Sequence, residues 1–258
     1  MEHILSLSYG KDSLACLGAI EELGLPLDRV VHIEIWATKT IQADLPPMVE
    51  FKEKADAIIK ERWGIVVEHI RGPRTAEQAI YRRRVRGKRK GEMVGWPRIR
   101  GCEIQSSCKR EPYRKATINA KTYLGIAADE PDRIARHSKR DGIILPLVEV
   151  KWTTEYCRQW CFDNNLLSPI YTTAPRGGCW FCPQQRVGQL RLLRRMYPEY
   201  WALMMKWDKD SPMKFKADGH TLHDYELRFQ MEDDGLLSSD EKVFRWNMLD
   251  SELNYRLF

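Results

Sequence analysis

The first half of the chain alternates short apolar runs with amphipathic stretches, and this alternation constrains the fold more than any other feature. Two stretches of helical length, 11–23 and 47–63, separate the first three runs. Five runs, mostly of β-branched residues, have the length and composition of strands: 4–8, 29–35, 65–70, 122–127 and 143–148. Strands that alternate with helices favour a parallel sheet with both faces covered. We therefore predict an α/β fold.

The second half of the chain is expected to be mainly helical. Helices are predicted over 153–164, with Thr153 or Thr154 as the N-cap, and over 187–197 and 198–209. The stretch from about 73 to 112 interrupts the alternation, is basic and contains four glycines, so we interpret it as an insertion with some helix. The expected domains are 1–184, which includes this insertion, and a helical C-terminal region, 185–258.

The composition is that of a soluble globular protein and excludes several classes. The 258 residues include 42 basic and 36 acidic side chains, a net charge of +6, which suits nucleotides or nucleic acid without establishing either. No stretch approaches the roughly 20 apolar residues that span a bilayer, and no basic leader precedes the first apolar run. Seven cysteines without an export signal suggest the cytoplasm, where clustered cysteines more often serve metal binding or catalysis than disulfides.

The first predicted strand leads into a turn and a helix start with the sequence Ser-Tyr-Gly-Lys-Asp-Ser at 8–13. Backbone N–H groups in such a turn, together with the helix N-terminus, form a site for an anion. Ser8 and Ser13 are expected to bind phosphate oxygens, Lys11 to neutralise them, and Asp12 to help hold Mg²⁺. Walker spacing is absent. The alternative is an ordinary turn in which Ser8 or Asp12 caps the helix.

This segment resembles the Ser-Gly-Gly-Lys-Asp-Ser loop of the PP-loop ATP pyrophosphatases. Within that superfamily the chain is most similar to the phosphoadenosine phosphosulfate (PAPS) reductase family, although Tyr9 stands where glycine is usual. Ala127 likewise replaces an arginine of the family pattern. Four further segments follow the family's order: 44–46, 125–133, 146–153 and 168–183.

The resemblance implies a five-stranded parallel sheet of order 3-2-1-4-5 with a nucleotide at the carboxyl edge of its strands. The implied ligand is ATP or a PAPS-like adenine nucleotide with Mg²⁺. The implied reaction is adenylylation of, or sulfur transfer onto, an acceptor, with a sulfur-donor protein as partner. Lys11 and Asp12 would be catalytic. The implied nucleotide-binding residues are Ser8, Tyr9, Gly10, Lys11, Asp12, Ser13, Glu130 and Arg133.

The cysteines fall into two groups. Two pairs, Cys102 with Cys108 and Cys179 with Cys182, supply four soft ligands, enough for tetrahedral zinc or a [4Fe-4S] cluster. Spacing does not choose between these metals. The resemblance favours iron and sulfur, and four unligated thiols are the remaining alternative. The other three, Cys16, Cys157 and Cys161, are expected to pack in the core as small apolar side chains.

The segment 82–90 concentrates seven cations in nine residues. Such a run suits nucleic acid or another anionic acceptor, and it equally suits a solvated loop.

Two alternative functions of the whole chain remain. One is a sulfonucleotide reductase. The resemblance implies that such a reductase carries a nucleophilic cysteine in a C-terminal tail, whereas this sequence has no cysteine after Cys182. The other is a nucleic-acid-binding module with a structural zinc site.

Overall fold

The computed structural model describes residues 1–97, 102–172 and 177–249. It contains a five-stranded parallel sheet in the order β3-β2-β1-β4-β5, which confirms the predicted fold class. The strands are β1 (His3–Ser6), β2 (Arg29–Glu34), β3 (Val67–Arg71), β4 (Lys121–Tyr123) and β5 (Ile143–Ile144). Leu5 of β1 pairs in register with Val30 of β2 and with Tyr123 of β4, so β1 lies at the centre.

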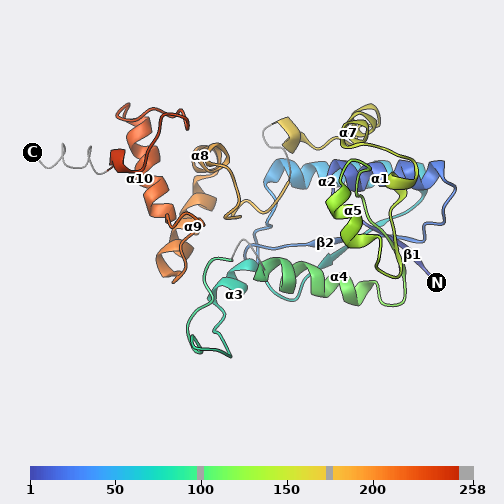
Figure 1. Cartoon of the computed structure of the whole chain (residues 1–258), viewed down its shortest axis with the longest axis horizontal. Coiled ribbons are helices and arrows are strands. Elements are labelled where there is room, and N and C mark those ends of the chain that lie inside the picture. The colour runs from blue at the N-terminus through green and yellow to red at the C-terminus, as the bar shows by residue number, and fades with distance from the viewer. Residues whose placement is uncertain (98–101, 173–176, 250–258) are drawn as a thin grey trace, which may run out of the picture. The chain divides into compact units, whose positions relative to one another are not determined.

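Helices cover both faces of this sheet (Figure 1). Leu5 and Val30 belong to a core cluster on the face covered by α1 (Lys11–Glu22), α2 (Pro46–Trp63) and α7 (Thr154–Asp163). Ile4 and Val31 point the other way, toward Tyr113 and Ala116 of α4 (Glu111–Ala116). The period of two along each strand thus places apolar side chains on both faces, as a doubly covered parallel sheet requires.

The remaining helices are short in the sheet region and longer near the C-terminus. Thr153 caps α7 by accepting a hydrogen bond from the Tyr156 N–H, as its sequence predicts. Besides α1, α2, α4 and α7, the helices are α3 (Ala76–Tyr81), a π-helix η1 (Gln105–Arg110), α5 (Pro131–His137), α6 (Pro146–Glu149), a 3₁₀ helix η2 (Pro169–Thr172), α8 (Val187–Met196), α9 (Pro198–Asp210) and α10 (Leu222–Asp233).

Two predicted strands end earlier than expected. The run 143–148 forms a strand only at Ile143–Ile144, because Pro146 has no N–H for the ladder and instead begins α6. The run 122–127 leaves the sheet after Tyr123, at the approach to Gly125. Most apolar residues beyond these points, such as Ile126, Leu145 and Leu147, are buried without pairing in the sheet, and their apolar character produced the overprediction.

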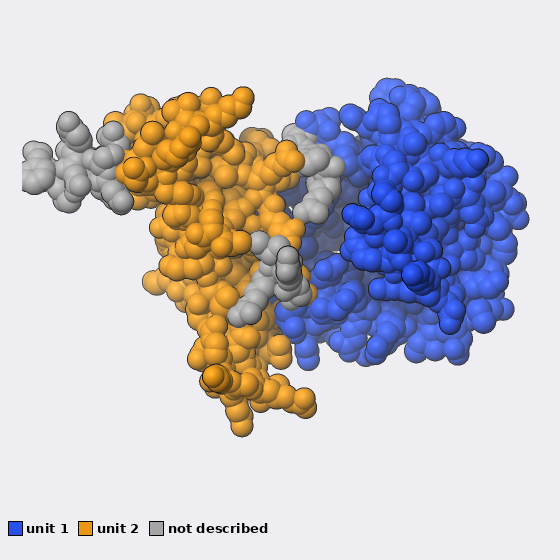
Figure 2. All heavy atoms as spheres, in the orientation of Figure 1, with its two compact units in different colours: residues 1–76, 103–180 blue, residues 77–102, 181–258 orange. Residues whose placement is uncertain are grey.

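The chain divides into two compact units (Figure 2). Unit 1 comprises Met1–Ala76 and Glu103–Trp180 and contains the sheet. Unit 2 comprises Glu77–Cys102 and Phe181–Phe258, so part of the expected insertion belongs with the C-terminal helices. Its interior includes Trp96, whose ring meets those of Trp207 and Phe215 edge-on. Within the described ranges, no helix is both long and apolar enough to cross a bilayer.

Candidate functional site

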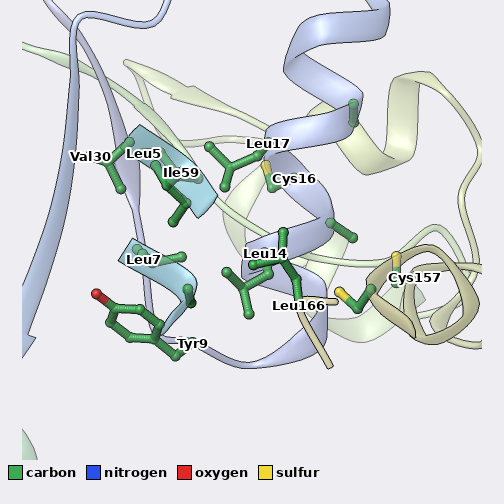
Figure 3. Packing of buried hydrophobic residues seen from close by; sticks show 14 of the residues in the cluster. Leu5, Leu7, Tyr9, Leu14, Cys16, Leu17, Val30, Ile59, Cys157 and Leu166 are labelled. Atoms are coloured by element: carbon green, nitrogen blue, oxygen red, sulfur yellow. The ribbon is translucent and has the colours of Figure 1, made fainter. Parts of the chain in front are cut away.

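The turn between β1 and α1 lies at the carboxyl edge of the sheet. Tyr9 adopts a left-handed conformation with a φ of 54°, which costs a non-glycine residue roughly 1–2 kcal/mol. Glycine adopts this conformation without that cost. The Tyr9 side chain is buried against the core beside Leu7, with its hydroxyl turned away from α1 (Figure 3). The Tyr9 ring therefore packs in the hydrophobic core.

Hydrogen bonds within the turn hold the predicted phosphate loop. The Ser8 N–H donates to Ser13 Oγ at 3.1 Å, and the hydroxyls of Ser8 and Ser13 lie 2.9 Å apart. Ser13 Oγ also donates to the Gly10 carbonyl at 2.9 Å. Lys11 Nζ forms an ion pair with Asp12 Oδ1 at 2.6 Å. The structure thus brings Ser8, Ser13, Lys11 and Asp12 together at the start of one helix.

The segment after β4 packs directly onto this helix start. A Cβ at Gly125 would lie 2.4 Å from the Asp12 carbonyl oxygen, so only glycine permits this approach. Asp129, four residues on, accepts hydrogen bonds from the Thr154 N–H and hydroxyl at 2.8 and 2.9 Å. Burial acts to raise the Asp129 pKa, but these bonds from Thr154 and the charge of Lys11 outweigh it and lower the pKa. Asp129 is therefore a second ionised carboxylate near Lys11.

Glu130 and Arg133 pair with each other. Both carboxylate oxygens of Glu130 accept from Arg133, at 2.7 and 2.6 Å, and one also accepts from the Ala127 N–H. The Arg133 side chain is 44% exposed, so the pair lies at the surface. The resemblance placed both residues at the nucleotide, and in the structure they brace the turn into α5.

The hydroxyl of Tyr171, a residue of η2, lies against the first residue of α1. It accepts a hydrogen bond from the Lys11 N–H at 2.9 Å. That N–H is one of the unsatisfied donors at a helix N-terminus, which a phosphate oxygen would otherwise accept. Tyr171 belongs to the segment 168–183, but its direct contact with the loop, 160 positions away in sequence, was not predicted.

A cavity of about 290 Å³ opens beside the loop within unit 1. Ser8, Tyr9 and Gly10 form one wall, and Tyr171 closes another side. The rest of the lining has a polar part and an apolar part: His32, Asp44 and Lys109, against Ile33, Ile35, Ala43, Met48, Ile170 and 177–179. Of the predicted binding residues, Lys11, Asp12, Ser13, Glu130 and Arg133 are not part of this lining.

A buried lysine, Lys52, holds two residues of the cavity lining. Lys52 of α2 donates to Asp44 at 2.6 Å and to His32 Nε2 at 2.9 Å. His32 Nδ1 lies 2.9 Å from the Leu7 carbonyl, which only accepts, so Nδ1 carries the proton and Nε2 accepts from Lys52. Burial and the nearby Lys52 charge hold the His32 pKa well below its usual range, so this ring is neutral.

A second histidine anchors Tyr9. The Tyr9 hydroxyl donates to Asp56 of α2 and lies 3.0 Å from His69 Nε2. His69 in turn faces Asp56 at 2.8 Å and Glu34 at 3.0 Å. The hydrogen bond to Asp56 is the main cause that raises the His69 pKa, and Glu34 adds to it. Sequence reasoning missed this cluster, because its members come from three separate elements and the turn before α1.

The four predicted metal-ligating cysteines are divided between the units. Cys108 and Cys179 belong to unit 1, and Cys102 and Cys182 belong to unit 2. Among the residues that the structure describes, no three His, Cys, Asp or Glu side chains are grouped so as to hold a metal ion. The cysteine metal site stays a prediction.

The other three cysteines are buried, as predicted. Cys16, Cys157 and Cys161 have no exposed surface. Burial is the main cause that raises all three thiol pKa values, that of Cys157 to about 12. Cys161 Sγ donates to the Lys11 carbonyl at 3.2 Å. Thiols that stay protonated are poor nucleophiles, so these three lack the reactivity of a catalytic thiol.

Fold and site together describe an α/β protein with a hydrogen-bonded turn and a cavity at the carboxyl edge of a parallel sheet. Comparison of the chain with protein-family models, with curated proteins and with solved structures found no match in any of the three. The proposals below therefore depend on the chain's own residues and on the motif resemblance.

Proposed function

We propose that unit 1 binds ATP or a related adenine nucleotide and transfers its adenylyl group to an acceptor, as a PAPS reductase-like PP-loop enzyme. The observation that carries the proposal is the loop 8–13, in which two hydroxyls, a lysine and helix N–H groups converge beside a cavity of about 290 Å³. A helix N-terminus in this position favours negative charge. The motif order along residues 1–185 supports the same assignment.

In the proposed reaction, an acceptor oxygen attacks the α-phosphorus of ATP. A new oxygen–phosphorus bond forms while the bond to the β-phosphate breaks, and pyrophosphate leaves with the electron pair. The loop N–H groups and Lys11 stabilise the charge that develops on pyrophosphate. Mg²⁺ would neutralise phosphate charge, and Asp12 and Asp129, both carboxylates near Lys11, fit such a hard cation.

Sulfur transfer would follow on the adenylylated acceptor. A sulfide from a donor protein attacks the activated carbon, and AMP leaves with the electrons of the carbon–oxygen bond. The alternative, a sulfonucleotide reductase, requires a reactive thiolate, and the buried thiols of Cys16, Cys157 and Cys161 lack that reactivity. We retain the four remaining cysteines as a proposed zinc or [4Fe-4S] site, which metal and sulfide analysis of anaerobically purified protein would distinguish.

Tyr171 has a defined role in this proposal. Its hydroxyl accepts the Lys11 N–H that a phosphate oxygen would take. Nucleotide binding therefore exchanges one acceptor for another at this N–H. The exchange favours the phosphate because hydrogen bonds to charged acceptors are roughly twice as strong as neutral ones.

The proposal is tested with Lys11→Ala, and with Lys54→Ala as a matched control on the exposed face of α2. Loss of a charge-assisted contact to phosphate is expected to weaken MgATP binding by about tenfold or more, measured by calorimetry. Lys54→Ala should bind like the wild type. Equal ATP affinity in Lys11→Ala and wild type would overturn the assignment of nucleotide binding to the loop. No release of pyrophosphate from ATP with any acceptor tested would overturn the proposed adenylyl transfer.

A further inference from the structure

The basic segment of the sequence forms a hairpin in unit 2, with an antiparallel bridge between its two arms. The Val94 N–H donates to the Arg82 carbonyl at 2.9 Å, and Arg84 and Glu92 pair through the Arg84 N–H at 2.9 Å. Arg83 and Met93 form an antiparallel bridge between these pairs. The turn at its tip includes Gly87 and closes with a hydrogen bond from the Lys90 N–H. We call residues 82–94 the basic hairpin; Figure 1 shows it extending away from α3.

Both arms of the basic hairpin are fixed at their base to α9. On one side, the Tyr81 hydroxyl donates to Asp210 at 2.5 Å. On the other, the Trp96 Nε1–H donates to Asp208 at 2.8 Å, and Trp96 is 1% exposed. The Gly95 N–H joins the two sides by donating to the Ile80 carbonyl at 2.9 Å. The hairpin is therefore mounted on a packed base, unlike a charge run in a loop without tertiary anchors.

The basic hairpin carries a net positive charge as large as that of the whole chain. Its seven cations and one carboxylate, Glu92, give +6, and the chain as a whole is also +6. Glu92 pairs with Arg89 at 2.5 Å. Four further cations, Arg83, Arg86, Lys88 and Lys90, have exposed side chains. So dense a group of cations repels itself, and a polyanion relieves that repulsion.

We propose that the basic hairpin docks on the sugar-phosphate backbone of duplex DNA through Arg83, Arg86, Lys88 and Lys90. The major groove of B-form DNA admits a two-stranded β-ribbon, whereas that of A-form RNA is too narrow. Proteins that bind single strands stack bases on aromatic side chains, and residues 82–94 include none. The hairpin also lacks Asn and Gln, which read adenine, so binding depends mainly on phosphate contacts.

The test compares two variants that each remove four positive charges. The hairpin variant carries Arg83→Gln, Arg86→Gln, Lys88→Gln and Lys90→Gln. The control carries Lys54→Gln, Lys60→Gln, Lys139→Gln and Arg158→Gln, all exposed positions of unit 1. Fluorescence anisotropy with a 20-base-pair DNA duplex, the matching single strand and an RNA duplex measures affinity across a salt series, and circular dichroism confirms folding.

The wild type and the control are expected to bind duplex DNA with a log–log salt slope of about −3 to −4, one phosphate for each of four cations. The hairpin variant should lose about one unit of slope per cation removed and at least about tenfold in affinity at low salt. Equal losses in both variants, or preference for single strands or RNA, would overturn the proposal. DNA binding requires no nucleotide, so Lys11→Ala should bind DNA like wild type, which separates failure here from failure at the loop.

Discussion

The loop 8–13 and the basic hairpin both carry cations for which we propose anionic ligands, but they hold those cations in opposite ways. Beside the loop, Lys11 is paired with Asp12, and Lys52 is buried between Asp44 and His32. In the hairpin, Glu92 is one carboxylate among seven cations, and four of the cations are exposed.

Paired cations at the loop and exposed cations on the hairpin suit different kinds of ligand. Paired cations leave little net charge, so a ligand at the loop is selected by directed hydrogen bonds, such as those of the Lys11 N–H and the Ser8 hydroxyl. Exposed like charges act over roughly a Debye length and are screened by salt. We therefore expect the loop to discriminate between small ligands and the hairpin to respond chiefly to charge density.

The largest expected effect of a single substitution is at Lys52. Lys52→Met preserves the length of the side chain but leaves Asp44 and the buried His32 Nε2 without the ammonium donor. Breaking a buried pair from one side costs about 3–5 kcal/mol, and the partial exposure of Asp44 places this case near the lower end. Urea denaturation measures the loss of unfolding free energy.

Lys54→Met is the matched control, because Lys54 lies on the same helix with its side chain exposed. Its expected effect is within about 0.5 kcal/mol. A loss below 1 kcal/mol in Lys52→Met would mean that the Lys52 ion pair does not stabilise the cavity wall, and the comparison between paired and exposed cations would fail.

A smaller, pH-dependent effect is expected at His69, which the Asp56 and Glu34 carboxylates face. Its pKa is raised above 6.5 in the folded state. The protonated ring therefore contributes stability that is fully present below pH 6.5 and is lost as pH rises through the folded-state pKa. The difference in unfolding free energy between wild type and His69→Gln should be largest near pH 6 and shrink toward pH 9.

The subtraction removes contributions from groups common to both proteins, including His32, whose lowered pKa gives the opposite pH dependence. Repeating the measurement in a Glu34→Gln background should reduce the pH dependence, because one of the two facing carboxylates is then neutral. A stability difference that is constant from pH 6 to pH 9 would contradict the assignment of a cationic His69.

The fold was predictable because its signals are local. Apolar runs, helix periodicity and the Thr153 cap depend on residues within a few positions of each other, and β1, β2, β3, α1, α2 and α7 follow them closely. The errors at 146–148 arose where an apolar, buried segment leaves the sheet. Pro146, which lacks the ladder donor, was the local signal for that ending.

The site was predictable only where it is contiguous. Residues 8–13 form the loop that their spacing indicated. The cluster of Tyr9, Asp56 and His69 depends on contacts across 47 and 60 positions, and Tyr171 on one across 160. The sequence alone shows a tyrosine at position 9, and it does not say that the tyrosine hydroxyl meets a histidine held between two carboxylates.

The smallest expected effect is on the stability of the hairpin variant itself. Arg83, Arg86, Lys88 and Lys90 lie at the surface, whereas Tyr81 and Trp96 fix the base of the hairpin. Replacing all four cations with Gln should change the unfolding free energy by less than about 1 kcal/mol in total, since surface substitutions are nearly neutral and mutual repulsion falls. A loss above 2 kcal/mol in urea denaturation would show that these cations support the fold. A near-neutral result beside a large loss in Lys52→Met would establish that the molecule uses its cations for structure at the loop and keeps them available for a ligand on the hairpin.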